Sequence, residues 1–210
     1  SSVHFLVIFF YDFFWYHISV SFHLFYITCL SPMIASNWDI IASEQAFVKR
    51  CGECGDEIGS RIICARIAER LMRLCFLYKN TYAPYSKWFG TAFSRLGVDM
   101  KLKNTISLAL AANSLEERED KIVEAQALVA EMHNASGLTA FVDYQIESFF
   151  GRNIKVIFAD KFAEVTANEL TNTLFENVPL IGTLSQIGGL SSFADEKEYC
   201  AQIVKLYDKQ

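Results

Sequence analysis

The sequence predicts a mainly α-helical protein, a helical bundle with at most a small strand pair near residues 154–159. Two observations predict this class. Apolar residues recur at helical spacing along most of the chain after Pro32, and capping residues or glycines fall where these stretches begin and end. The best strand candidate is the short run IKVIFA at residues 154–159.

The first helices follow from spacing and from two glycines. Residues 34–48 form one predicted helix, which the loop RCGECG at residues 50–55 should end. Asp56 or Glu57 then begins a long helix to about Tyr78. Its predicted core side consists of Ile58, Ile62, Ala65, Leu71, Cys75 and Tyr78.

Three further helices are predicted in the middle of the chain. Pro84 suits the first turn of a helix to Leu96, which stops at Gly97, and another helix runs from about Met100 to Ala112. Ser114 and Glu117 form a capping box that opens a helix to about Asn134. The bundle is therefore expected from residues 57–78, 83–96, 100–112 and 114–134.

The last third is less regular. A short helix is predicted at residues 138–150, and an amphipathic helix should run from Asp160 to about Leu174. A turn region rich in proline and glycine precedes a final predicted helix at residues 192–207.

Composition limits the classes of function. Of the 210 residues 52% are apolar and 20% charged, which excludes a disordered chain. The net charge of −5 argues against nucleic acid as a primary partner, although a local basic face is allowed. Six cysteines in a chain with ample core material indicate reduced thiols and a cytoplasmic protein.

Residues 1–31 differ from the rest in composition. The apolar residues 5–30 have the length of a membrane span, but Asp12, His17 and His23 interrupt them and no basic residue flanks them. Three interpretations stay open: a buried helix, a membrane span, and a non-native stretch. We therefore expect an apolar segment at 1–31 and one helical domain at 33–210, with membrane contact only through residues 5–30.

Several motifs have two interpretations each. The pair Cys51 and Cys54 has the spacing of a redox dithiol or half a zinc site, but no second pair of ligands is present, which favours an interhelical loop. An arginine row, Arg66, Arg70 and Arg73, shares one helix face and suits either phosphate or a solvated surface.

Other candidate positions lack catalytic partners. Ser60 has no patterned base, and no nucleophile-elbow, P-loop or dinucleotide motif occurs. His133 is expected at a helix cap or the surface. The segment APYSKW at residues 83–88 is either a packing corner or faces a ligand. No catalytic residue or metal ligand is assigned.

One long stretch resembles a known family. The run SNWDIIASEQAFVKRCGECGDEIGSRIICARIAERLMRLCFLYKNTYAPYSKWFGTAFSRL at residues 36–96 resembles the domain-of-unknown-function family numbered 4037. RNIKVIFADKFAEV and PLIGTLSQIGGLSSFAD, farther on, are similar to the C-terminal part of that family, so the resemblance covers about residues 33–210.

The resemblance implies a helical domain that docks beside a nucleotidyltransferase catalytic domain and helps shape its substrate site. Family-matching positions become substrate-binding candidates: Glu44, Arg50, Asp56, Ser60, Arg66, Tyr85, Lys87 and Trp88. The first hypothesis is a substrate-binding or regulatory module that is inert alone, with the catalytic domain and a nucleotide-like molecule as its partners.

The catalytic signature of such enzymes is missing from this sequence. Gly59-Ser60 is the one Gly-Ser pair, and no spaced Asp-x-Asp follows it. Magnesium and a nucleoside triphosphate are therefore expected only with a catalytic domain, and no cofactor is expected in this chain. Two alternatives stay open: a non-catalytic part that a separate catalytic chain completes into an active enzyme, and a membrane-anchored helical protein.

Deletion of residues 1–32 should leave a soluble, cooperatively folded fragment. The break in composition after residue 31 is the reason. Urea unfolding of residues 33–210, followed by circular dichroism, is the measurement. A fragment without a cooperative transition would show that the N-terminal segment belongs to the core.

Overall fold

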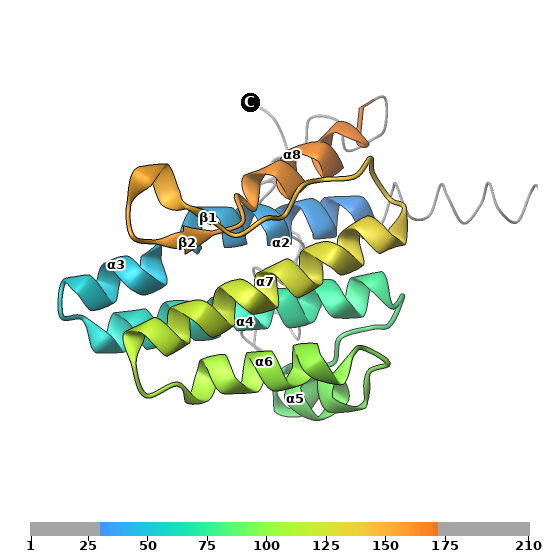
Figure 1. Ribbon diagram of the computed structural model, residues 1–210. Helices are drawn as coiled ribbons and strands as arrows, with labels where there is room; N and C mark the ends of the chain where they lie inside the picture. The colour runs from blue at the N-terminus through green and yellow to red at the C-terminus, as the bar shows by residue number, and fades with distance from the viewer. Residues whose placement is uncertain (1–29, 172–210) are drawn as a thin grey trace, which may run out of the picture.

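The computed structural model describes residues 30–171, and within this range it is mainly helical (Figure 1). The predicted N-terminal segment, the end of the helix expected to reach residue 174 and the helix at 192–207 lie outside the described residues. The helices are α2 (Ser31–Glu44), α3 (Phe47–Glu53), α4 (Glu57–Tyr78), α5 (Ser86–Arg95), α6 (Met100–Ala111), α7 (Leu115–Ser136) and α8 (Asp160–Asn168).

A two-stranded antiparallel sheet completes the described fold. Strands β1 (Glu147–Ser148) and β2 (Lys155–Val156) pair Glu147 with Val156, and the 3₁₀ turn η2 (Phe149–Gly151) lies between them. This hairpin confirms the strand pair predicted near residues 154–159, although β2 is only two residues long.

The long helix α4 runs through the centre of the bundle. Glu44 at the end of α2 pairs with Arg66, and Trp38 bonds to Tyr78, so α2 runs antiparallel to α4. Arg118 contacts Glu57 while His133 contacts Tyr78, so α7 runs parallel to α4. Figure 1 shows α5 and α6 on one side of this pair, and α8 with the hairpin on the other.

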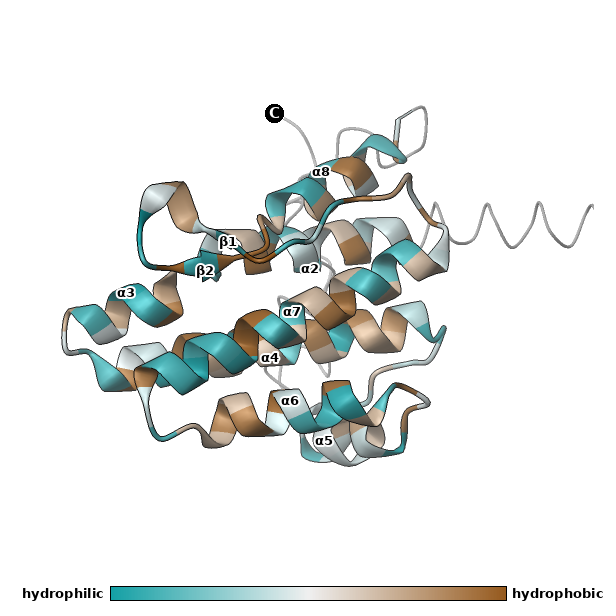
Figure 2. Ribbon diagram, in the orientation of Figure 1, coloured by the Kyte–Doolittle hydropathy of each residue, from teal (hydrophilic) through white to brown (hydrophobic). Residues whose placement is uncertain are grey.

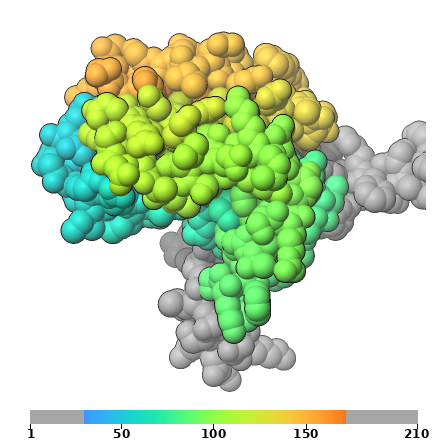
Figure 3. Space-filling model, turned by 60° about the horizontal axis from the view of Figure 1, so that its bottom comes forward, coloured from blue at the N-terminus to red at the C-terminus, as the bar shows by residue number. Residues whose placement is uncertain are grey.

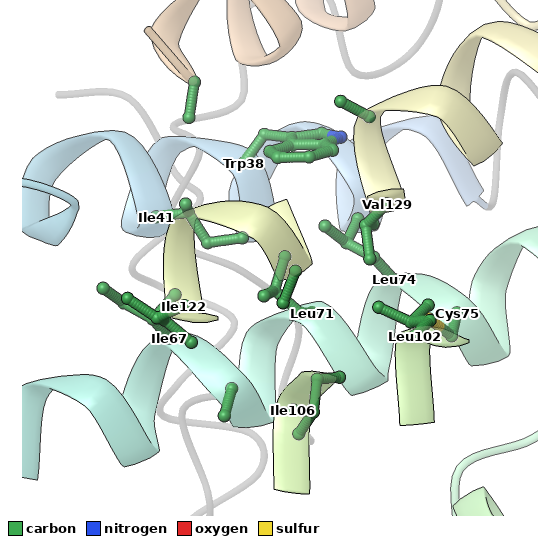
Figure 4. Packing of buried hydrophobic residues seen from close by; sticks show 14 of the residues in the cluster. Trp38, Ile41, Ile67, Leu71, Leu74, Cys75, Leu102, Ile106, Ile122 and Val129 are labelled. Carbon is green, nitrogen blue, oxygen red and sulfur yellow. The ribbon is translucent and has the colours of Figure 1, made fainter. Parts of the chain in front are cut away.

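The core forms where α2, α4, α6 and α7 meet. Trp38 and Ile41 of α2, Leu71 and Leu74 of α4, and Ile122 of α7 are fully buried. Figure 4 shows these side chains pointing toward one another between the helices, with Leu102 and Ile106 of α6 closing the group. Figure 2 shows hydrophobic residues, in brown, and hydrophilic residues, in teal, interspersed along α4 and α7.

Two predicted helices have different bounds in the structure. The helix predicted at 34–48 is two helices, broken at Gln45 and Ala46. The amide oxygen of Gln45 accepts a hydrogen bond from the Ala159 N–H, and Ala46 packs against Ile154 and Val156. These contacts come from residues more than 100 positions away, which local spacing does not reveal.

The predicted core side of α4 is also partly wrong. Leu71 and Cys75 are buried, but Ile58 and Ile62 are 74% and 54% exposed, and Ala65 is exposed. The true inner face carries Ser60, Cys64, Ile67 and Leu71. In the first turns of α4 the apolar side chains of Ile58 and Ile62 therefore lie on a different face from the residues that pack inward.

The helix predicted at 138–150 is wrong. Beyond Gly137, which has the left-handed φ of 66° that ends α7, the chain is irregular up to β1. The amide of Asn134 accepts from the Val142 N–H and donates to the Val142 carbonyl. This pair of side-chain hydrogen bonds replaces the backbone bonds that a helix would make there.

A chain of hydrogen bonds connects α2, α4, α7 and the segment that follows α7. Trp38 Nε1 donates to the Tyr78 hydroxyl, 2.9 Å away, and that hydroxyl lies 2.9 Å from His133 Nδ1. His133 Nε2 lies 2.8 Å from Thr139 Oγ1, which itself donates to the Ala140 carbonyl. Because the Thr139 proton is used, His133 donates from Nε2 and accepts at Nδ1, which makes it a neutral histidine.

The prediction that His133 is a cap or surface residue is therefore wrong. Its side chain is fully buried, and Phe162 and Trp38 meet it edge-on. Burial lowers the pKa of His133 from 6.5 to about 4, because the charged ring would lose its hydration. His133 is a packed core group that links α7 to α4.

The stability of the protein should fall as the pH drops from 6.5 to about 4. The unfolded chain takes up a proton at His133 near pH 6.5, whereas the folded protein resists protonation down to about pH 4. The difference corresponds to about 3 kcal/mol. Urea unfolding across this range measures it, and His133→Gln should have the shallower pH slope. Equal slopes for both proteins would contradict this assignment.

Candidate functional site

The glycine-rich motif at residues 50–59 builds the corner between α3 and α4. A side chain at Gly52 would meet the Leu115 side chain at 2.4 Å, so this glycine lets α3 approach the start of α7. Gly55 has a φ of 77°, which suits the turn between the helices. Asp56 caps α4 by accepting from the Gly59 N–H at 2.7 Å, and a side chain at Gly59 would meet that carboxylate.

Ser60 is buried at the centre of this corner. Its hydroxyl donates to the Val48 carbonyl and accepts from Arg118 Nη1, each at 2.7 Å. Arg118 is 1% exposed and forms an ion pair with Glu57, whose pKa is lowered mainly by the hydrogen bond from that guanidinium. Both hydrogen-bonding roles of the hydroxyl are filled by α3 and α7, which makes Ser60 a structural residue.

A second charged cluster centres on the buried amine of Lys49. Lys49 of α3 lies 3.1 Å from Glu116 and 3.6 Å from Glu119, both on α7. Glu119 also accepts from the Lys155 N–H of β2 at 2.9 Å. This cluster fixes α3, α7 and the hairpin together, and its members are partners for one another rather than for a ligand.

The predicted binding residues do not converge on one surface. Arg50 is exposed on α3, with its guanidinium 5.4 Å from the centre of the Phe47 ring. Tyr85, Lys87 and Trp88 are exposed at the start of α5. Phe89 packs on Phe76 and lies under Arg73, so α5 covers the far part of α4.

The length of α4 is the physical reason for this separation. About 24 Å of helix lies between Glu57 and Arg73, at 1.5 Å per residue. Figure 1 shows α3 at one end of the bundle and α5 displaced toward the other. Arg50 and Lys87 therefore do not line one pocket. A separate role for each residue in binding stays a prediction.

Glu44 and Arg66 are predicted site residues that the structure joins across two helices. They form an ion pair between the end of α2 and the middle of α4. Glu44 is 8% exposed, and burial raises the pKa of its carboxyl while Arg66 and Arg70 oppose that rise. Its second oxygen is buried and accepts no hydrogen bond.

Arg70, one turn after Arg66, is the unexpected member of this group. Arg66 and Arg73 are paired with Glu44 and Glu69, but Nη1 of Arg70 is buried and donates to no partner among residues 30–171. Burial is the main cause that lowers the pKa of Arg70. The neighbouring Glu69 raises this pKa, whereas repulsion from Arg73 and Arg66 lowers it further. We call Arg66, Arg70 and Arg73, together with Glu44 and Glu69, the arginine row. Its spacing is visible in the sequence, but the unpaired state of Arg70 is not.

The cysteines divide into exposed and buried ones. Cys51 is partly buried and Cys54 exposed, and both are free thiols at the end of α3. Cys64 and Cys75 are buried, and burial raises the pKa values of their thiols to about 11 and about 12. Among residues 30–171, no group of three or more His, Cys, Asp or Glu side chains is placed to hold a metal ion.

Part of the chain matches a known protein family. Residues 29–89 match a family described as a domain of unknown function, DUF4037. This part of the chain is DUF4037-like. The matched residues include α2, α3, α4 and the first turn of α5, and therefore the whole arginine row and the α3–α4 corner. No curated protein and no solved structure shows significant similarity to the chain.

The DUF4037 match confirms the resemblance inferred for residues 36–96 over most of its length. The resemblance proposed for the later segments lies beyond the matched residues and stays a prediction. In the part of the chain that the structure describes, no helix is long and apolar enough to cross a membrane.

Replacing Ser60 by alanine should destabilise the protein by about 2 kcal/mol. The change removes one hydrogen-bond partner from the buried Val48 carbonyl and one from the Arg118 guanidinium. Urea unfolding gives the free energy. Ser94→Ala is the matched control, because the exposed Ser94 hydroxyl bonds only within its own helix, to the Thr91 carbonyl. Equal stabilities of the two variants would remove Ser60 from the junction.

Proposed function

We propose that this chain is a cytoplasmic, helical substrate-binding or regulatory module of a nucleotidyltransferase-like protein, inert alone. It works beside a catalytic domain and contributes a cation to the binding of a nucleotide-like ligand. The DUF4037 match, which covers α2 to α4, supports the family context. The missing Asp-x-Asp pattern in the sequence supports a non-catalytic role.

The observation that carries this proposal is the state of Arg70. A guanidinium offers five N–H donors and recognises phosphate or carboxylate oxygens through pairs of hydrogen bonds. Arg70 is only partly buried, yet it forms no ion pair with the carboxylates of the described residues, and its buried Nη1 is unsatisfied. An anionic group that reaches the open side of Arg70 would accept hydrogen bonds from its other donors and balance its charge.

The neighbours of Arg70 set the charge of the row. Three guanidinium groups face two carboxylates, Glu44 and Glu69, so the row keeps one net positive charge. Glu44 and Glu69 hold Arg66 and Arg73 in place, and Arg70 between them is the group left to meet a ligand. The module in this proposal supplies one positioned cation, and the catalytic domain supplies magnesium and the triphosphate site.

The affinity of a catalytic domain for ATP should rise when this chain is added. The test uses the catalytic domain of a longer DUF4037-containing protein, with magnesium and ATP, in isothermal titration calorimetry. Arg70→Gln should weaken ATP binding by the complex roughly tenfold, as expected for a lost charge-assisted hydrogen bond. Arg61→Gln is the control, because Arg61 is an exposed arginine of the same helix that pairs with Glu57.

Two results would contradict the proposal. The ATP affinity of the catalytic domain would be the same with and without this chain, or the two arginine variants would behave alike. The second result would show that the arginine row serves only to hold α2 against α4.

A further inference from the structure

The region around α5 differs in charge from the rest of the protein. Residues 70–98 contain five lysines and arginines and no aspartate or glutamate, in a chain of net charge −5. The acidic excess therefore lies elsewhere in the chain. Two of these cations, Arg70 and Arg73, belong to the arginine row, and Lys87 and Arg95 lie on α5.

Three aromatic side chains are exposed in the same region. Tyr82, Tyr85 and Trp88 are 86%, 63% and 50% exposed. Trp88 and Arg95 lie seven residues apart on α5 and so share one helix face, and Lys87 Nζ lies 5.3 Å from the centre of the Trp88 ring. We call Tyr82, Tyr85, Lys87, Trp88 and Arg95 the α5 face. Figure 3 shows this part of the chain, in green, projecting from the body of the molecule.

The α5 face stands on a fixed support. On the inner side of α5, Phe89 and Phe93 pack against Phe76 with ring centres 5.5 and 6.5 Å apart. The connection from α4 is held by hydrogen bonds from the Asn80 and Thr81 N–H groups to the last turn of α4. A partner that binds here meets side chains whose backbone is already ordered, which lowers the entropic cost of association.

The cations of the α5 face are free for a partner. Lys87 and Arg95 are exposed and form no ion pair with any carboxylate in residues 30–171. The α5 face resembles in composition the centre of a protein interface, where Trp, Tyr and Arg carry most of the binding energy. The three rings expose about 400 Å², roughly half of what one partner buries in a standard interface.

We propose that the α5 face is the surface through which this module docks onto its protein partner. The partner presents an apolar patch for the three rings, with carboxylates opposite Lys87 and Arg95. This inference rests on the proposed function, since the partner it identifies is the catalytic domain. The net negative charge of the chain disfavours nucleic acid here, even though stacked rings and cations also bind single strands.

Binding of the full chain to the catalytic domain of a longer DUF4037-containing protein tests the inference, with biolayer interferometry as the readout. Trp88→Ala and Tyr85→Ala should each weaken binding at least tenfold. Lys87→Glu should weaken it too, and more strongly at 50 mM than at 500 mM salt, because it reverses a charge that faces carboxylates. Circular dichroism of each variant confirms that the fold is retained.

Phe141→Ala is the matched control. Phe141 is a similarly exposed aromatic, 74% exposed, in the irregular segment after α7 and so outside the α5 face. Its removal should leave the affinity for the catalytic domain unchanged. A control variant that loses as much binding as Trp88→Ala would overturn the assignment of the α5 face.

The outcomes separate the two proposals. If the wild-type chain does not bind the catalytic domain, the proposed function and the docking surface both fail. If it binds and Trp88→Ala and Tyr85→Ala bind equally well, only the docking surface fails. Binding of a fluorescent 20-nucleotide single strand that Trp88→Ala abolishes would overturn the inference in favour of nucleic acid. Self-association that depends on Trp88, measured by sedimentation, would overturn it in favour of a second copy.

Discussion

The buried contact between Ser60 and Arg118 is the constraint on which the arrangement of the helices depends. A fully buried guanidinium must have its donors satisfied, and here the partners come from α4 alone: the Ser60 hydroxyl and the Glu57 carboxylate. Ser60 in turn holds the Val48 carbonyl of α3. Three helices, α3, α4 and α7, thus meet at one hydroxyl, and this contact fixes the start of α7 against the start of α4.

The sequence predicted the elements whose signals are local. The bounds of α4 agree with Glu57 to Tyr78, and α7 begins at the expected cap, where the Ser114 hydroxyl accepts from the Glu117 N–H. The return bond of the capping box goes to the Asn113 N–H instead of Ser114. Periodicity and capping are properties of a few neighbouring residues, so they can be read without knowing the fold.

Features that depend on residues far away in the sequence could not be predicted from local patterns. The break at Gln45 needs Ala159, and the burial of His133 needs α2 and α8 around it. Ser60, a substrate-binding candidate from the sequence, and Gly52 are explained by contacts with Arg118 and Leu115 of α7, more than fifty residues later. The same limit applies to Arg70, because spacing places it on a face but does not show which neighbours already have partners.

The absence of acidic residues around α5 affects how the protein orients while it diffuses toward a partner. Residues 70–98 hold five of the 19 lysines and arginines and none of the 24 aspartates and glutamates, and such an uneven distribution of charge contributes to an electric dipole of the molecule. In the field of an acidic surface such a molecule turns as it diffuses, so that its basic end leads. The gain is in the rate of productive encounter and is lost as the Debye length shortens, whereas the lifetime of the bound state depends on the packed rings.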